Sequence, residues 1–194
     1  IATFFNGIFK VLKRSDKLVL YFTNLKLPFI LIFIFFIFFI VYKSWMNNKI
    51  IIINGPNINL LGEREQSQYG SITFDNLKKE CMAKSKELGL STEFAQSNVE
   101  GELVNLIQNA REKFDGMIIN AAAFTHTSVA IRDALEIFKK PIIEVHISNI
   151  YKREEFRKKS LISDVVTGGI FGLNADGYIL AIISMQKLIQ NENR

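Results

Sequence analysis

Apolar residues between positions 49 and 189 fall into short runs that are separated by longer amphipathic stretches. This alternation is typical of strands followed by helices. The strand-like runs are 49–54, 91–96, 116–120, 141–147 and 164–171. Helical periodicity covers 73–88, 100–113, 127–139 and 175–189, and a short charged helix is expected near 152–160.

Several strand-like runs show no polar alternation, which indicates strands covered by helices on both faces. Short connections join the runs, and the order of elements is that of repeated βαβ units. The pattern therefore predicts an α/β domain of the flavodoxin-like type, with three α/β/α layers around a five-stranded, doubly wound parallel sheet. In such sheets ligands bind beyond the carboxyl ends of the strands.

The first 45 residues differ in kind from the rest. They hold ten of the 17 phenylalanines, and 27–42 is an uninterrupted apolar run. A membrane-spanning helix needs about 20 apolar residues, so this run is marginal in length. Two interpretations stay open: a start assigned too early, with translation beginning at Met46, and a membrane anchor through about 27–42. We favour the first and expect the working domain to be 46–194.

The net charge of +5 belongs to the same segment, because 1–45 carries six Lys or Arg and one Asp. The remaining 18 basic and 18 acidic residues balance, so the charge gives little support to nucleic-acid binding by this domain. A single cysteine, Cys81, excludes an internal disulfide framework and fits the reducing cytoplasm. Two histidines and one cysteine are too few for a structural zinc site.

Polar residues gather after the first, third and fourth strand-like runs. The segments are 54–65 with Tyr69, 120–128, and 144–149 followed by 153–157. Because carboxyl ends of parallel strands share one edge of a sheet, these segments predict an active site there. Both histidines of the chain, His126 and His146, fall at this edge.

Five motifs occur in order: GPNINLLGEREQSQYG from Gly55, QSNVEGEL from Gln96, THTSVAIRDAL from Thr125, EVHISN from Glu144 and REEFR from Arg153. Together they resemble type II 3-dehydroquinate dehydratases across essentially all of 49–183. The resemblance implies dehydration of 3-dehydroquinate to 3-dehydroshikimate in the shikimate pathway. It also implies a dodecamer built from trimers, with no metal and no organic cofactor.

Roles for individual residues also follow from the resemblance. Tyr69 corresponds to the base that acts as a phenolate, and His146 to the acid that protonates the departing hydroxyl. An unperturbed tyrosine has a pKa of about 10, so a cation such as Arg64 is needed to favour the phenolate. Glu144, two residues before His146 on one strand, is expected on the same sheet face, where it orients the imidazole or raises its pKa. The other residues implied are Asn57 for the enolate and, for substrate binding, Asn120, His126, Asp133 of an adjacent subunit, Ile147, Ser148 and Arg157.

Plainer interpretations exist for single residues. Arg153 is expected on a solvated helix face, Thr127 can cap a helix, and Asp133 can pair with Arg132. Gln66 and the pair Ala121–Ala122 depart from the family pattern without removing a functional group. Rival functions are a flavodoxin-like module that binds FMN or an anion, and a membrane-tethered interaction protein. The joint occurrence of the motifs favours the enzyme.

Overall fold

The computed structural model describes residues 32–39, 48–63 and 72–192. The chain divides into two units, Ile1–Trp45 and Met46–Arg194. In the first unit residues 32–39 form a helix whose side chains are all apolar and 45–73% exposed. Within the described ranges no helix has both the length and the apolarity that crossing a bilayer requires. Half of the candidate anchor, 27–42, lies outside those ranges.

Five parallel strands form the sheet of the second unit in the order β2-β1-β3-β4-β5. Their bounds are β1 Lys49–Asn54, β2 Ser91–Gln96, β3 Gly116–Asn120, β4 Ile142–His146 and β5 Gly168–Phe171. The chain runs from β1 outward to β2, then returns past β1 to build β3, β4 and β5. This is the doubly wound topology expected from the sequence, and its switch point lies between β1 and β3.

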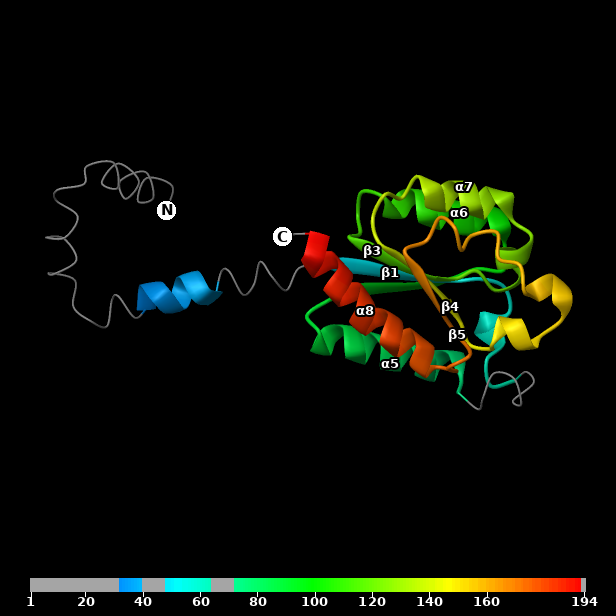
Figure 1. The fold of residues 1–194 in the computed structure, drawn as a ribbon. Coiled ribbons are helices and arrows are strands. Elements are labelled where there is room, and N and C mark those ends of the chain that lie inside the picture. The colour runs from blue at the N-terminus through cyan, green and yellow to red at the C-terminus, as the bar shows by residue number, and fades with distance from the viewer. Residues whose placement is uncertain (1–31, 40–47, 64–71, 193–194) are drawn as a thin grey trace, which may run out of the picture. The chain divides into compact units, whose positions relative to one another are not determined.

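Helices cover both faces of the sheet. Helices α5 (Phe74–Glu87) and α8 (Asp176–Glu192) lie on one face, and α6 (Glu100–Ala110) and α7 (Val129–Glu136) lie on the other (Figure 1). Thr73 caps α5 by accepting a hydrogen bond from the Asn76 backbone N–H at 3.3 Å. The predicted three-layer α/β/α architecture is thus confirmed.

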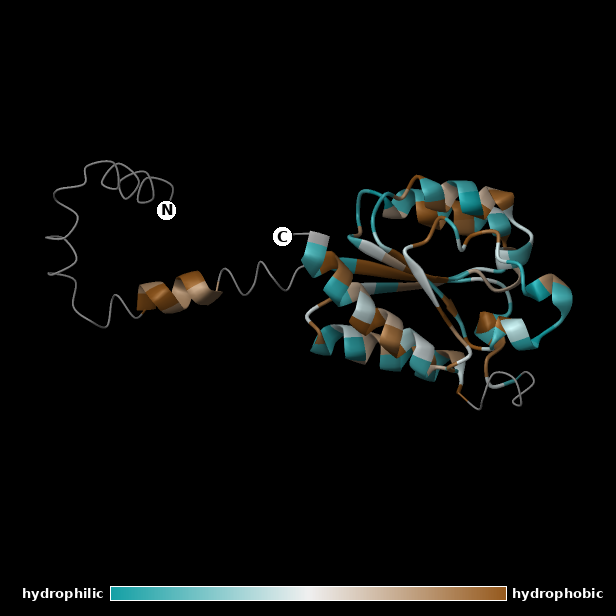
Figure 2. Ribbon diagram, viewed as in Figure 1, coloured by the Kyte–Doolittle hydropathy of each residue, from teal (hydrophilic) through white to brown (hydrophobic). Residues whose placement is uncertain are grey.

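The core forms two apolar layers, one on each side of the sheet. Even-numbered residues of β1, such as Ile50 and Ile52, pack against Leu77 and Ala181 of the α5–α8 layer. Odd-numbered residues, such as Ile51, pack toward the α6–α7 layer. Because both faces are buried, the central strands are continuously apolar, and the hydropathy colouring shows brown strands between helices with teal outer faces (Figure 2).

Three expectations about local structure were wrong. The fifth strand begins at Gly168, not at 164, because Val165 and Val166 pack against the core from a turn outside the sheet. The charged helix at 152–160 is instead two short 3-10 turns, Ile150–Lys152 and Glu155–Arg157. Helix α7 begins after Ser128, whose hydroxyl accepts from the Ile131 N–H at 2.9 Å, so Thr127 is not its cap.

Two glycines let backbone segments approach near the carboxyl ends. A Cβ on Gly55 would lie 2.5 Å from the carbonyl oxygen of Ala121, so β1 and β3 approach too closely for any other residue. Gly172 follows β5 with φ +81°, and a Cβ there would lie 2.7 Å from the Asn149 side chain. The chain can therefore bring the ends of β1 and β3, and of β4 and β5, close together around one opening.

Candidate active site

A pocket opens at the switch point of the sheet, between the loop after β1 and the segments after β3 and β4. Seven of the predicted site residues border it: Asn57, Asn120, His126, His146, Ile147, Ser148 and Arg157. They come from parts of the chain up to 100 positions apart and meet only because the parallel strands end at one edge.

His146 ends β4 and is only 5% exposed. Its Nε2 lies 2.9 Å from Oε1 of Glu144, whose side chain is fully buried. The hydroxyls of Ser160 and Ser163 also donate to that carboxylate, at 3.1 and 3.0 Å. A carboxylate only accepts, so the His146 Nε2 carries a hydrogen that it donates to Glu144. The side chains of Glu144 and His146 lie on the same face of the sheet, because side chains alternate between faces along a strand.

His126 lies beside His146, with ring centroids 6.1 Å apart and the planes inclined by 25°. Its Nδ1–H donates to the carbonyl oxygen of Lys159 at 2.8 Å, which fixes the tautomer and leaves Nε2 as the acceptor. Burial lowers the pKa of His126 below its ordinary value, and the bond to the carbonyl of Lys159 opposes that shift. His126 is therefore neutral near pH 7. The neighbouring imidazole, His146, differs in that it pairs with a carboxylate.

Two arginines from the segment after β4 reach the pocket. Arg157 is half-buried, its Nε lies 3.0 Å from the Glu154 carboxylate, and its guanidinium lies over the ring of Phe156. Arg153 also lines the pocket, with 15% of its side chain exposed. The expectation that Arg153 belongs to a solvated helix face was wrong. The extended backbone at Arg153 interrupts the helical path and separates the two 3-10 turns.

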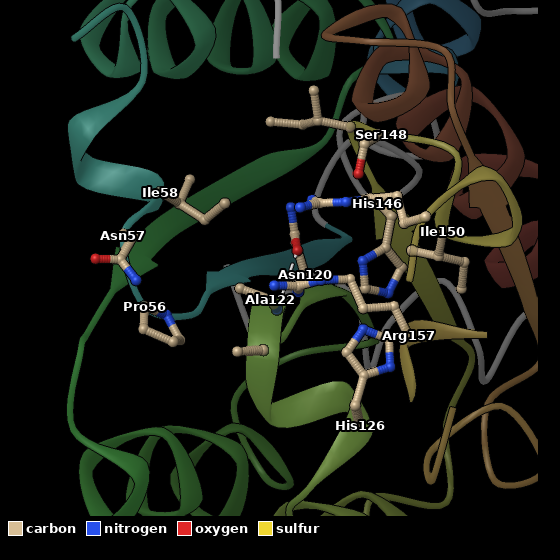
Figure 3. Close-up of a pocket in the computed structure, with 13 residues that line it drawn as sticks. Pro56, Asn57, Ile58, Asn120, Ala122, His126, His146, Ser148, Ile150 and Arg157 are labelled. Carbon is tan, nitrogen blue, oxygen red and sulfur yellow. Dashed lines mark hydrogen bonds between the residues drawn. The ribbon is translucent and has the colours of Figure 1, made fainter. Parts of the chain in front are cut away.

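Asn57 is exposed on the side of the opening across from the histidines (Figure 3). Its backbone is left-handed at φ 66°, and its N–H donates to the Asn98 side chain at 2.8 Å. Ser148 is half-buried, whereas Ile147 is buried and also belongs to the α5–α8 core layer. Arg157 and Asn120 extend between these two sides in Figure 3.

Two predicted residues that the structure describes, Glu144 and Asp133, do not line this pocket. Glu144 lies behind His146. Asp133 is on α7 with 67% of its side chain exposed and 3.9 Å from the Arg132 guanidinium, so within one chain it does not reach the pocket. Arg64 and Tyr69, together with Gln66, lie outside the described residues.

Sequence reasoning missed several residues of the lining. They are Pro56, Ile58, Ala122, Ala123, Ile150 and Arg153. Most are apolar and shape the opening, and their proximity to the motifs was the only signal that pointed to them. Among the described residues no three His, Cys, Asp or Glu side chains are grouped so that they could hold a metal ion.

The resulting site combines one buried imidazole–carboxylate pair, a neutral imidazole, two carboxamides and two guanidinium groups. A pair of histidines in different environments provides an acid and a hydrogen-bonding partner side by side. Guanidinium groups bind carboxylates in a fixed geometry. The arrangement is suited to a small anionic molecule that carries several oxygens and reacts by proton transfer.

Comparisons with known proteins agree with this chemistry. Residues 48–186 match the family model described as dehydroquinase class II. A 3-dehydroquinate dehydratase of Endomicrobium trichonymphae is 52% identical over 141 residues, covering 73% of this chain and 99% of the relative.

Solved structures show the same likeness. The type II dehydroquinase of Propionibacterium acnes superposes with a TM-score of 0.70 at 42% identity, covering 72% of this chain and 97% of that one. The enzyme of Butyrivibrio crossotus gives a TM-score of 0.71 at 43% identity, with 73% and 98% covered. The family model spans well over half of the chain, and the sequence and fold agree along nearly the full length of these relatives. The chain belongs to the dehydroquinase class II family.

Proposed function

We propose that this chain dehydrates 3-dehydroquinate to 3-dehydroshikimate and water, in the shikimate pathway that leads to chorismate and aromatic amino acids. The observation that carries the proposal is the His146–Glu144 pair at the wall of a cationic pocket, in a chain of the dehydroquinase class II family. The pair supplies a proton donor where an anionic, oxygen-rich substrate is held.

The first step is removal of a proton from the carbon next to the ketone. Tyr69 takes this proton as a phenolate, and the guanidinium of Arg64 favours that charged form. The electron pair of the broken C–H bond moves onto the ketone oxygen and gives an enolate. Asn57, at the opening across from the histidines, stabilises the enolate oxygen through an ordered water.

In the second step the enolate collapses and expels the hydroxyl from the β carbon in an anti elimination. His146 gives the departing oxygen a proton, so that water leaves and a conjugated enone remains. Glu144 holds the imidazole through Nε2 and balances the positive charge that His146 carries before transfer. The two Ser hydroxyls on Glu144 keep the carboxylate in an accepting role.

Substrate binding falls to the groups around this pair. Arg157 donates to the substrate carboxylate together with the backbone N–H groups of Ile147–Ser148 and the Ser148 hydroxyl. His126 and Asn120 bind hydroxyl oxygens. Asp133, which is exposed on α7, contributes to the pocket of a neighbouring subunit, so a homo-oligomer completes the site. We propose a trimer-based dodecamer in the cytoplasm, and light scattering of the purified chain measures its size.

The test is an assay of the full chain with 3-dehydroquinate, following the ultraviolet absorbance of the conjugated enone. Wild-type protein is expected to turn over, and Tyr69→Phe, which removes only the hydroxyl, is expected to lose at least about 100-fold in kcat. A folded wild-type chain that forms no enone product contradicts the proposal. Turnover by Tyr69→Phe at the wild-type rate contradicts the role of the base alone.

A further inference from the structure

Beneath the floor of the pocket, three polar side chains are connected by hydrogen bonds. Asn54 ends β1, Asn120 ends β3, and Tyr178 lies in the first turn of α8. All three are at most 2% exposed. Asn54 and Asn120 are register partners in the sheet, and Tyr178 reaches both from the covering helix.

The bonds run in one direction. The Asn54 Nδ2 donates to the carbonyl of Ala95 at 3.1 Å, and the Tyr178 hydroxyl donates to the Asn54 Oδ1 at 2.6 Å. The Asn120 Nδ2 then donates to the Tyr178 oxygen at 2.8 Å. Finally, the backbone N–H of Ala122 donates to the Asn120 Oδ1 at 3.1 Å.

Both ends of this series are backbone groups whose roles are fixed, because a carbonyl only accepts and an N–H only donates. Turning the amide of Asn54 or Asn120 by half a rotation would therefore bring two donors or two acceptors together. Only one orientation of each amide satisfies every member. In that orientation Asn120 keeps one Nδ2 hydrogen for a ligand in the pocket that it borders.

The Tyr178 hydroxyl is the central link. Burial raises its pKa well above the ordinary range for tyrosine, so the hydroxyl stays protonated and continues to donate to Asn54. Removing it would leave an acceptor on Asn54 and a donor on Asn120 without a partner in a site closed to water. Buried groups in that condition are costly and turn toward other partners.

We propose that Tyr178 and Asn54 are positioning residues, which hold the Asn120 carboxamide so that its remaining Nδ2 hydrogen meets an acceptor oxygen of the bound substrate. This inference rests on the proposed function, in which Asn120 binds a hydroxyl oxygen of 3-dehydroquinate. Neither Tyr178 nor Asn54 touches the substrate. A reversed Asn120 amide would present an oxygen to an oxygen and weaken binding.

The first test is Tyr178→Phe in the full chain, which deletes one oxygen atom. We expect KM to rise about tenfold while kcat stays within about threefold, because a binding contact is misdirected and the acid and base are untouched. Tyr151→Phe, which removes a hydroxyl from an exposed ring, serves as the matched control and is expected to keep wild-type KM. A folded Tyr178→Phe variant with KM within twofold of wild type overturns the proposal.

A double-mutant cycle separates positioning from general damage. In an Asn120→Ala background, Tyr178→Phe is expected to change KM less than about twofold, because the group that it positions is already absent. A tenfold rise in both backgrounds would show that Tyr178 acts independently of Asn120 and would overturn the proposal.

A measurement without substrate distinguishes failure of this inference from failure of the proposed function. The amide proton of Asn120 that is bonded to the Tyr178 oxygen, followed by 15N NMR of wild-type protein, should exchange with solvent at least about 100-fold more slowly than the side-chain amide protons of Asn105 on the exposed face of α6. Equal rates overturn the positioning role even if the enzyme is active. Slow exchange in a chain that does not turn over 3-dehydroquinate supports the hydrogen-bonded connection of Asn54, Tyr178 and Asn120 and rejects only the activity.

Discussion

The strand ends and the segment 148–157 border the same pocket but are built differently. At the strand ends Asn120 and His146 are nearly inaccessible, and buried partners fix their orientation. In the later segment Arg157 is partly exposed and pairs with Glu154, a carboxylate that is itself half in solvent. The groups proposed to act by their direction thus lie in buried hydrogen-bond networks, whereas Arg157, the group proposed to bind the substrate carboxylate, is free to adjust its position.

The difference has a physical cause. A hydrogen bond inside the protein competes with no water, so losing one partner leaves a costly unsatisfied group. An exposed ion pair is worth well under about 1 kcal/mol, because water replaces either partner. Substitutions in the His146–Glu144 pair should therefore change the rate of the chemical step. Substitutions of Arg157 and its exposed partner should mainly change binding.

Among variants that compare the two regions, the largest effect is expected for Glu144→Gln. The glutamine amide places N–H donors where the Glu144 carboxylate accepts from Ser160 and Ser163. It also carries no negative charge to support the proton that His146 donates, so kcat should fall about 100-fold. Steady-state kinetics with 3-dehydroquinate measure this loss of kcat. Glu154→Gln is the comparison variant at the exposed end, and its kcat should stay within about threefold. Equal losses in the two variants would remove the distinction between the two regions.

A smaller effect is expected for Arg157→Lys. Lysine keeps the charge but loses the planar pair of donors, so KM should rise about tenfold with kcat nearly unchanged. The same kinetic assay gives both constants. A fall in kcat as large as that of Glu144→Gln would place Arg157 in the chemical step and contradict the assignment to binding.

The smallest effect concerns stability and pH. Burial lowers the pKa of His126 in the folded protein, so the unfolded chain takes up the proton first as pH falls below about 6.5. The folded state binds fewer protons there, and the free energy of unfolding should decrease as pH falls through that window. Urea unfolding of wild type and His126→Gln between pH 7.5 and 5.5 should show a larger decrease in wild type than in the variant. A difference between the two proteins that is independent of pH would contradict it.

Much of this organisation could be predicted from sequence. Continuous apolar runs identified the sheet, and the rule that parallel strands end at one edge placed Asn120, His146 and their neighbours together. The same patterns failed at 164–167, where Val165 and Val166 resemble a strand but pack from a turn. They also failed at Arg153, because charge alternation alone does not show whether a segment continues as a helix.

Tyr178 and Asn54 show a second limit of the sequence. Tyr178 lies in an apolar helix and looks like core, and Asn54 precedes a loop and looks like a cap. Their connection spans 124 positions and depends on the register of β1 with β3, which no local pattern contains. Cys81, in contrast, is fully buried in α5, and that burial raises the pKa of its thiol to about 12.

The most direct test of the account is a comparison of the wild-type chain with His146→Gln in the 3-dehydroquinate assay at neutral pH. Glutamine can still bond to its neighbours but cannot act as an acid. We predict rapid formation of the enone by wild type, and a loss of at least about 100-fold in kcat with KM within about threefold for the variant. Turnover by His146→Gln within about threefold of wild type, in a folded protein, would contradict the assignment of the buried pair to the chemical step.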